Sequence, residues 1–254
     1  MKKPLLKFKI NNKFPKFYTI SQFFKIAGTI IICLSRIREQ YFKMRFLLPP
    51  SILACLLVFV SFIPAKQVSP SIVTVSPLAG YSTEWNDGRY LKCNTAANAK
   101  YMTAAEKEVI YILNLARINP ALFANTVIKK YPTQHSDYYS SLFKTMLTLK
   151  PLKLIYPDSL CFAGAQCHAI NSGQEGYAGH TRSQQECRKK WYYNGECCDY
   201  GHNEPVDIIM SLLIDEDIPS LGHRSICLDD YKGMGVSIQF HKTYRYNTVL
   251  DFHY

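Results

Sequence analysis

The chain has 254 residues and a formal net charge of +11, enough length for one sizeable domain with appendages. The positive charge is concentrated at one end. Residues 1–45 contain eleven Lys and Arg against one acidic residue, whereas residues 46–254 contain nineteen against eighteen. A basic tail on a nearly neutral body argues against a nucleic-acid-binding domain and predicts no nucleic-acid partner.

Residues 44–65 have the pattern of a secretory signal peptide. A positive start at Met44-Arg45 precedes an uncharged apolar run at 46–63, and cleavage is expected after Ala65. Residues 1–43 are then a basic extension that results from a mis-assigned start codon. The protein is expected to be secreted or held in the cell envelope. The alternative is an uncleaved N-terminal anchor, and membrane contact is expected only through this segment.

Residues 66–100 are rich in Ser, Pro, Thr, Asn and Gly and show no sustained periodicity, so they are interpreted as a linker. Residues 101–254 are interpreted as one folded domain.

Nine cysteines fit an exported protein, because disulfides persist in oxidising compartments. No C-x-x-C spacing occurs, and Cys197 and Cys198 are adjacent, which argues against a zinc finger. Structural disulfides are favoured over a catalytic thiol, and their pairing cannot be deduced from the sequence. Seven cysteines lie beyond the predicted signal: Cys93, Cys161, Cys167, Cys187, Cys197, Cys198 and Cys227.

The first predicted helix begins at Thr103. Thr103 and Glu106 form a capping box, in which each side chain accepts a hydrogen bond from the other residue's backbone N–H. Apolar residues follow at helical spacing. Asn119-Pro120 ends or kinks this helix and favours the start of another.

Two further helices are predicted. One runs from Asp158 or Ser159 to Asn171, and the other begins at Asn203-Glu204-Pro205. The side chains expected to face inward from the first of these are Leu160, Ala163, Cys167 and Ile170.

Two strand-like runs close the chain, at residues 234–241 and 248–253, with 242–247 as a hairpin loop between them. Helices therefore precede strands. This order predicts an α+β fold in which helices pack on a small antiparallel sheet.

Three histidines lie next to a glycine, namely His180, His202 and His223. His180 and His223 are 43 positions apart, so folding must create any site that they share. The chain has no HExxH, no GxSxG and no phosphate-binding glycine loop, which disfavours enzymes with local motifs. Histidines interpreted as packed, capping or sheet residues are His168, His202, His241 and His253.

Seven short motifs follow one another between Ala104 and Tyr254. They are Leu113-Asn114-Leu115-Ala116-Arg117 with Asn119-Pro120, Pro157-Asp158-Ser159-Leu160, Cys167-His168-Ala169, Gly179-His180, Gly195-Glu196-Cys197, Gly222-His223-Arg224 and Gly233-Met234-Gly235-Val236. In this order they resemble the CAP superfamily of cysteine-rich secretory, antigen 5 and pathogenesis-related proteins, and in particular its bacterial SCP-like branch. The resemblance covers about 150 residues.

The resemblance implies a three-layer α-β-α sandwich with a central cleft. In many family members two histidines and two glutamates line that cleft and hold a divalent ion, often Zn²⁺. The matching residues here are His180, His223 and Glu196. Leu212 occupies the place of the second glutamate.

Residues near the cleft complete the expected site. Asp215 or Glu216, one turn after Leu212, is the candidate substitute for the second glutamate. Arg224 is expected to pair with an acidic residue such as Glu196. Two imidazoles and one carboxylate with an open position suit zinc, and the same groups without metal form a polar cleft.

The leading functional hypothesis is a binding or interaction module that takes a ligand or a divalent metal at this cleft. Its partner is expected to be an extracellular lipid, glycan or protein. No catalytic residue is assigned under this hypothesis. One alternative is a zinc-dependent hydrolase with His180 and His223 as ligands and Glu196 as general base. Another is a structural extracellular protein with a vestigial cleft.

Overall fold

The structure is a computed structural model that describes residues 75–132, 136–190 and 192–254. These residues belong to one compact unit, Ile72–Tyr254. The expected signal or anchor at 44–65, the extension 1–43 and the first part of the linker lie outside the described residues. Within them, every helix is too short or too polar to cross a membrane.

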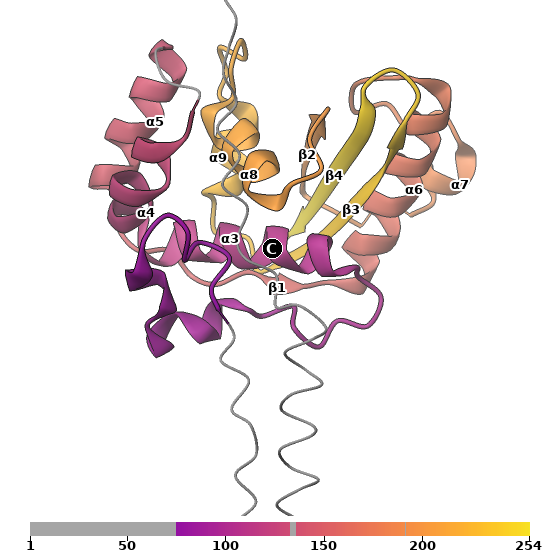
Figure 1. Cartoon of the computed structure of the whole chain (residues 1–254). Coiled ribbons are helices and arrows are strands. Elements are labelled where there is room, and N and C mark those ends of the chain that lie inside the picture. Colours follow the sequence, from indigo (N-terminus) through magenta and orange to yellow (C-terminus); the bar gives the residue numbers. More distant parts are fainter. Residues whose placement is uncertain (1–74, 133–135, 191) are drawn as a thin grey trace, which may run out of the picture. The chain divides into compact units, whose positions relative to one another are not determined.

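All of the described helices precede the last two strands, as the α+β prediction expects, whereas the two earlier strands lie between helices (Figure 1). The helices are η1 (Thr83–Asn86), η2 (Gly88–Cys93), α3 (Ala104–Ile118), α4 (Pro120–Thr126), η3 (Ile128–Lys130), α5 (Asp137–Thr148), α6 (Ser159–Glu175), α7 (Gln185–Arg188), α8 (Pro205–Ile214) and α9 (Gly222–Cys227). The strands are β1 (Tyr156–Pro157), β2 (Gly195–Tyr200), β3 (Gly233–His241) and β4 (Arg245–His253).

The four strands form one sheet in the order β1-β3-β4-β2. β2 and β3 both pair with β4 in antiparallel fashion, but β1 runs parallel to β3. The sheet is therefore mixed, and the expectation of a purely antiparallel sheet was wrong. Neither β1 nor β2 was predicted, because β1 has two residues and β2 is buried along most of its length, so it lacks alternating polarity.

The hairpin between β3 and β4 is tighter than expected. β4 begins at Arg245, so residues 242–244 alone form the turn. Arg245 itself has a φ of 72° and pairs with His241, which is how the two long strands close on each other.

The helix starts follow the predicted capping signals. Thr103 and Glu106 form the capping box of α3, and Asn119 caps α4 with Pro120 in its first turn. Buried Glu106 also accepts the backbone N–H of Ile238 at 3.0 Å. Because β1 covers only the first residues of β3, this carboxylate satisfies a donor on the otherwise open strand edge.

Helices lie against both faces of the sheet. α6 packs across β3 and β4, while α3 contacts β3 and both α8 and α9 contact β2 from the other side (Figure 1). The side chains of β2 divide accordingly. Cys197 belongs to the large core cluster that includes α3 and α8, whereas Cys198 packs with Ala165 and Ala169 of α6.

α6 packs on the sheet through small residues. A Cβ added to Gly235 of β3 would lie 1.9 Å from the backbone nitrogen of Phe162, and one added to Gly173 would lie 2.1 Å from the carbonyl oxygen of Phe240. Only glycine allows this approach of two backbones. Leu160 and Ile170 were expected to face inward, but both are exposed, so that expectation was wrong. The helix buries its small residues instead, because they allow its backbone to lie close to the sheet.

The described part of the expected linker, residues 75–100, is packed against the domain. Its buried side chains include Leu78, Trp85, Tyr90 and Cys93, and the Trp85 indole N–H donates to Thr126 Oγ1 at 3.0 Å. Short 3₁₀ helices and turns make up this stretch, and they leave no periodic pattern in the sequence.

Two residues of the first-helix motif hold loops in place from inside the core. Asn114 bonds the backbone of Cys93 and both backbone groups of Ile155. Arg117 donates to the carbonyl oxygens of Cys227, the last residue of α9, and of Asp229, which follows it. The motif therefore acts here by joining α3 to distant segments.

Candidate functional site

His180 and His223 lie next to each other. His180 is in the loop after α6, and His223 is in the first turn of α9. Their ring centres are 6.1 Å apart, and the ring planes are inclined by 39°. The two residues approach from opposite faces of the sheet and meet beside β2, its edge strand. Folding thus creates the contact that the sequence separation required.

His180 is held by Glu196 of β2. The Nδ1 atom of His180 lies 2.9 Å from Glu196 Oε1. The imidazole is 58% exposed, whereas the carboxylate side chain is only 4% exposed. The hydrogen bond with Glu196 raises the pKa of His180 against the opposing effect of burial. The carboxylate therefore stands behind the ring and leaves Nε2 as its free nitrogen.

His223 is held in the same way by Asp215. The Nδ1 atom of His223 lies 2.8 Å from Asp215 Oδ1, and the side chains are 20% and 1% exposed. Asp215 Oδ2 also accepts the backbone N–H groups of His223 and Arg224. Asp215 ends α8 with a φ of 58°, a left-handed conformation that aspartate tolerates better than most residues. Its carboxylate can thereby cap α9.

The other candidates for the second acidic position lie elsewhere. Leu212 is buried in the apolar core, and Glu216 Oε2 accepts a hydrogen bond from Ser136. Of the two proposed substitutes, the structure therefore brings Asp215 to the histidine and leaves Glu216 outside the site.

Arg224 does not pair with Glu196, so that expectation was wrong. Its guanidinium donates to the carbonyl oxygens of Leu213, Ile214 and Tyr138 and to Ser141 Oγ. The reason is topological: α9 and the carboxylate of Glu196 lie on opposite faces of the sheet. Arg224 instead joins α9 to α8 and α5.

Arg182 is the partner of Glu196 that sequence reasoning missed. Its Nη2 donates to Glu196 Oε2 and, at 2.9 Å, to Asp251 Oδ2. Both Arg182 and Asp251 are buried, and Tyr193 OH accepts from Arg182 Nε at 3.2 Å. The one sequence signal was position, since Arg182 follows His180 by two residues.

The two carboxylates around Arg182 hold their protons differently. Burial by itself would raise the pKa of Glu196, but the hydrogen bond from His180 and the charge of Arg182 lower it. Burial raises the pKa of Asp251 to about 8, with the neighbouring charge of Glu196 acting in the same direction. The positive charge of Arg182 lowers the pKa of both carboxylates, so at Asp251 it opposes the rise that burial causes.

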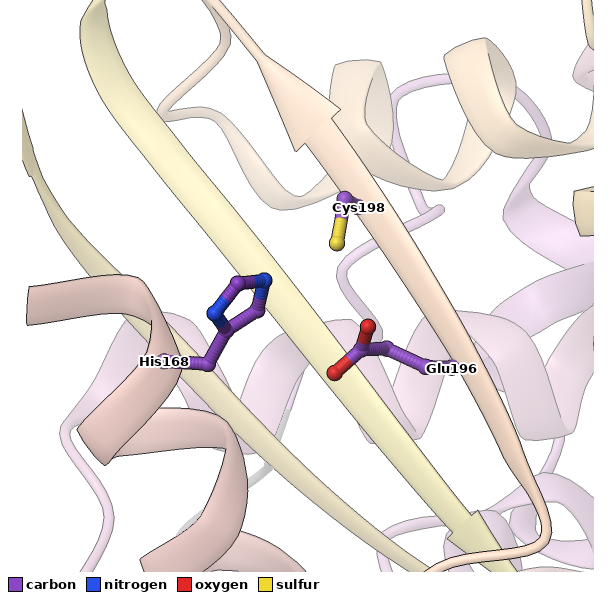
Figure 2. A group of neighbouring side chains, drawn as sticks. All are labelled: His168, Glu196 and Cys198. Atoms are coloured by element: carbon purple, nitrogen blue, oxygen red, sulfur yellow. The ribbon is translucent and has the colours of Figure 1, made fainter. Parts of the chain in front are cut away.

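A buried group beside this network could hold a metal ion. His168 of α6 and both Glu196 and Cys198 of β2 point into the same space (Figure 2). One ligand atom from each lies within 4.8 Å of the others. In the described part of the chain, His180, Glu196 and His223 do not form such a group, because the Glu196 carboxylate sits at Nδ1 of His180, on the inner side of the ring.

The chemistry of the buried group limits metal binding there. Burial raises the pKa of the Cys198 thiol well above its usual value, yet a cysteine must lose its proton to bind a metal. Arg182 also places a positive charge against Glu196. His168 Nε2 already bonds the Gly179 carbonyl oxygen at 2.9 Å. The three side chains thus find their hydrogen-bond partners outside the group, at Gly179, His180 and Arg182.

The other histidines of the described residues have local roles. His202 Nδ1 lies 3.0 Å from Asp199 Oδ1, three residues earlier in the chain. His241 is buried, bonds the Tyr177 carbonyl oxygen and accepts from the backbone of Thr243 and Tyr244. His253 stacks on Tyr192.

The expectation of structural disulfides is confirmed by one pair. Cys167 of α6 and Cys187 of α7 are bonded. The other cysteines of the described residues are free and buried: Cys93, Cys161, Cys197, Cys198 and Cys227.

Comparison with known proteins identifies no relative. No family model matches the chain, and no curated protein or solved structure is similar to it.

Proposed function

We propose that the chain is an exported CAP-type binding module that holds a divalent metal ion, preferably Zn²⁺, between His180 and His223. One observation carries the proposal: two neighbouring, solvent-reaching imidazoles each have their Nδ1 atom bonded to a buried carboxylate. The helices on both faces of a small sheet fit the sandwich that the CAP resemblance implies.

The paired carboxylates support metal binding because they fix each imidazole as a ligand. A histidine that donates from Nδ1 to a carboxylate keeps its Nε2 lone pair available and becomes more basic, which is the usual arrangement behind a metal-bound histidine. Here Glu196 holds the Nδ1 atom of His180 and raises the pKa of that imidazole, and Asp215 holds the Nδ1 atom of His223.

The spacing of the rings is close to that of a shared ion. With Zn–N bonds of about 2.0–2.1 Å and tetrahedral geometry, two imidazoles on one zinc ion have ring centres about 5 Å apart. The ring centres of His180 and His223 are 6.1 Å apart, so the rings would close by about 1 Å on binding zinc. Two protein ligands leave positions for water and for an oxygen of the extracellular ligand, whether lipid, glycan or protein. Bound zinc would supply Lewis acidity to that oxygen.

The hydrolase alternative is less well supported. A general base needs a carboxylate oxygen that can reach a water molecule. Glu196 is almost fully buried, and its two oxygens already accept from His180 and Arg182. A vestigial cleft is also less well supported, since both imidazole–carboxylate pairs are complete.

Zinc binding can be tested by calorimetry and metal analysis on the full chain. We expect one zinc ion per chain, and His180→Ala and His223→Ala should each remove it. His202→Ala is the matched control. His202 is also partly exposed and bonded to a carboxylate, that of Asp199, but it is not one of the two proposed zinc ligands.

Two results would refute the assignment. The first is full zinc binding in His223→Ala. The second is loss of zinc binding in His168→Ala and Cys198→Ser but not in His223→Ala. That result would assign the ion to the buried group of His168, Glu196 and Cys198.

Export is tested separately by N-terminal sequencing of protein recovered outside the cytoplasm. A mature chain that begins at Lys66 supports cleavage after Ala65. A recovered chain that begins at Met1 contradicts the signal peptide.

A further inference from the structure

Cys197 of β2 and Cys227 of α9 are buried thiols on two elements that pack against each other. Neither side chain has exposed surface, and both belong to the same core cluster. Burial first, and then the neighbouring Cys227 thiol, raise the pKa of the Cys197 thiol. Cys197 Sγ also lies 3.7 Å from the carbonyl oxygen of His223, one helical turn before Cys227. The end of α9 therefore rests on the start of β2.

The alternation of β2 selects Cys197 over its neighbour. Successive side chains of a strand point to opposite faces. Cys198 accordingly packs against α6, where Figure 2 shows it pointing toward His168, on the face away from Cys227. The sequence did not indicate whether Cys197 or Cys198 would face another cysteine. The sheet separates them, because their side chains lie on opposite faces.

We propose that Cys197 and Cys227 form a second disulfide when the chain folds in the presence of a disulfide oxidant. One thiolate attacks the oxidant, such as oxidised glutathione, and forms a mixed disulfide while releasing one thiol. The second cysteine thiolate then displaces the other thiol. The protein loses two electrons and two protons, which the two released thiols carry. The product is a bond of about 2.05 Å between the two sulfur atoms.

The bond forms before the core closes. Both thiols are fully buried in the folded chain, so an oxidant reaches them while α9, a helix of six residues, is still undocked. Once formed, the bond is sheltered from reductants for the same reason.

The consequence for the site rests on the proposed function. α9 carries His223, and β2 carries Glu196, which holds His180. A Cys197–Cys227 bond would tie both halves of the histidine pair together, so that α9 cannot move away from β2 without breaking it.

Peptide mapping tests the bond without reference to zinc. The full chain is refolded with oxidised and reduced glutathione, alkylated and digested with trypsin without reduction. Cleavage after Lys190, Arg224 and Lys232 places Cys197 and Cys198 in peptide 191–224 and Cys227 in peptide 225–232. We expect these two peptides to be cross-linked, with a mass two hydrogens below their sum. The link should disappear in Cys197→Ser and persist in Cys198→Ser.

The Cys167–Cys187 bond serves as the internal control, since it joins peptides 154–182 and 183–188 in the same digest. If that link forms and the 191–224 to 225–232 link does not, the proposal is wrong. A link that survives Cys197→Ser overturns it as well.

A second measurement follows the effect on stability. In the Cys167→Ser/Cys187→Ser variant, refolding with a reductant instead of oxidised glutathione prevents the proposed bond from forming, and we expect Tm to be lower by roughly 5–10 °C than in the oxidatively refolded sample. An unchanged Tm in a sample that carries the mapped link would contradict the claim that the bond ties α9 to β2.

Discussion

Glu196 and Asp215 are nearly inaccessible to solvent. Each nevertheless accepts a hydrogen bond from an imidazole that is itself in contact with solvent. Burying a carboxylate is costly unless it is paired, so each of these acids needs its partners. For Glu196 the partners are His180 and Arg182, and for Asp215 they are His223 and the start of α9. At the scale of single residues, the two buried carboxylates fix the orientation of the two imidazoles.

Replacing Glu196 with Gln should weaken zinc binding by about 10- to 100-fold, the usual effect of removing such a partner. The amide keeps the shape but loses the charge that makes His180 basic. Calorimetry measures the affinity. Asp199→Asn, which removes the equivalent charge beside His202, should leave zinc binding unchanged.

The same pair predicts the pH dependence of zinc binding. A proton competes with metal for His180, and the bond to Glu196 raises the pKa of His180 above its usual 6.5. Affinity should therefore fall as the pH drops through that raised value. In Glu196→Gln the midpoint should move to lower pH, as measured by zinc titrations from pH 5 to 9. An unchanged midpoint would exclude His180 as the titrating ligand.

Asp251 should make folding stability fall with rising pH. Its pKa is about 8 in the folded protein, above the ordinary 3.8, so the folded state binds more protons between these values. Stability from this residue is complete at low pH and is lost as the pH rises to about 8. Asp251→Asn should flatten this slope in urea denaturation at pH 5–9. A variant with the wild-type slope would show that another group is responsible.

At the scale of the elements, small side chains on the buried face of α6 determine how close this helix lies to the sheet. Bulky apolar residues at helical spacing usually mark the buried face of a helix. In α6 the bulky Leu160 is exposed, while Gly173 and Ala165 face the sheet. Small residues let the helix backbone lie directly on β3, which brings His168 and the following His180 loop beside β2.

Gly235→Ala should destabilise the fold by about 3 kcal/mol or more, because overpacking at a backbone contact cannot be relieved by a side-chain rotation. The added Cβ would meet the backbone of Cys161 and Phe162. Gly80→Ala is the control, since a Cβ there has no atom within 4 Å. Equal stability of both variants in urea denaturation would contradict the close packing of α6.

At the scale of the whole described domain, the fold extends further toward the N-terminus than composition indicated. Residues 76–99 contribute Leu78, Trp85 and other buried side chains to the same cluster as α3 and α8. This lead-in covers α3 and supplies the Cys93 carbonyl that Asn114 bonds. The domain that carries the site therefore begins before residue 101.

Trp85→Ala should cost about 3–5 kcal/mol, the range for removing a large aromatic side chain from a core. Trp85 is 1% exposed and donates to Thr126. Leu91→Ala, at a side chain that is 51% exposed, should change stability by less than about 0.5 kcal/mol. If the two variants unfold at the same urea concentration, the lead-in is not part of the core.

The sequence by itself determined the features that depend on neighbours within a few residues. The capping box at Thr103, the Asn119-Pro120 start and the last two strands are of this kind, because caps and periodicity act along the chain. The tertiary structure alone decided that Asp215 rather than Glu216 holds His223, that Arg182 rather than Arg224 holds Glu196, and which cysteines meet. Each of these contacts depends on the face of the sheet against which a segment packs. Residue patterns within a few positions of one another do not indicate that face.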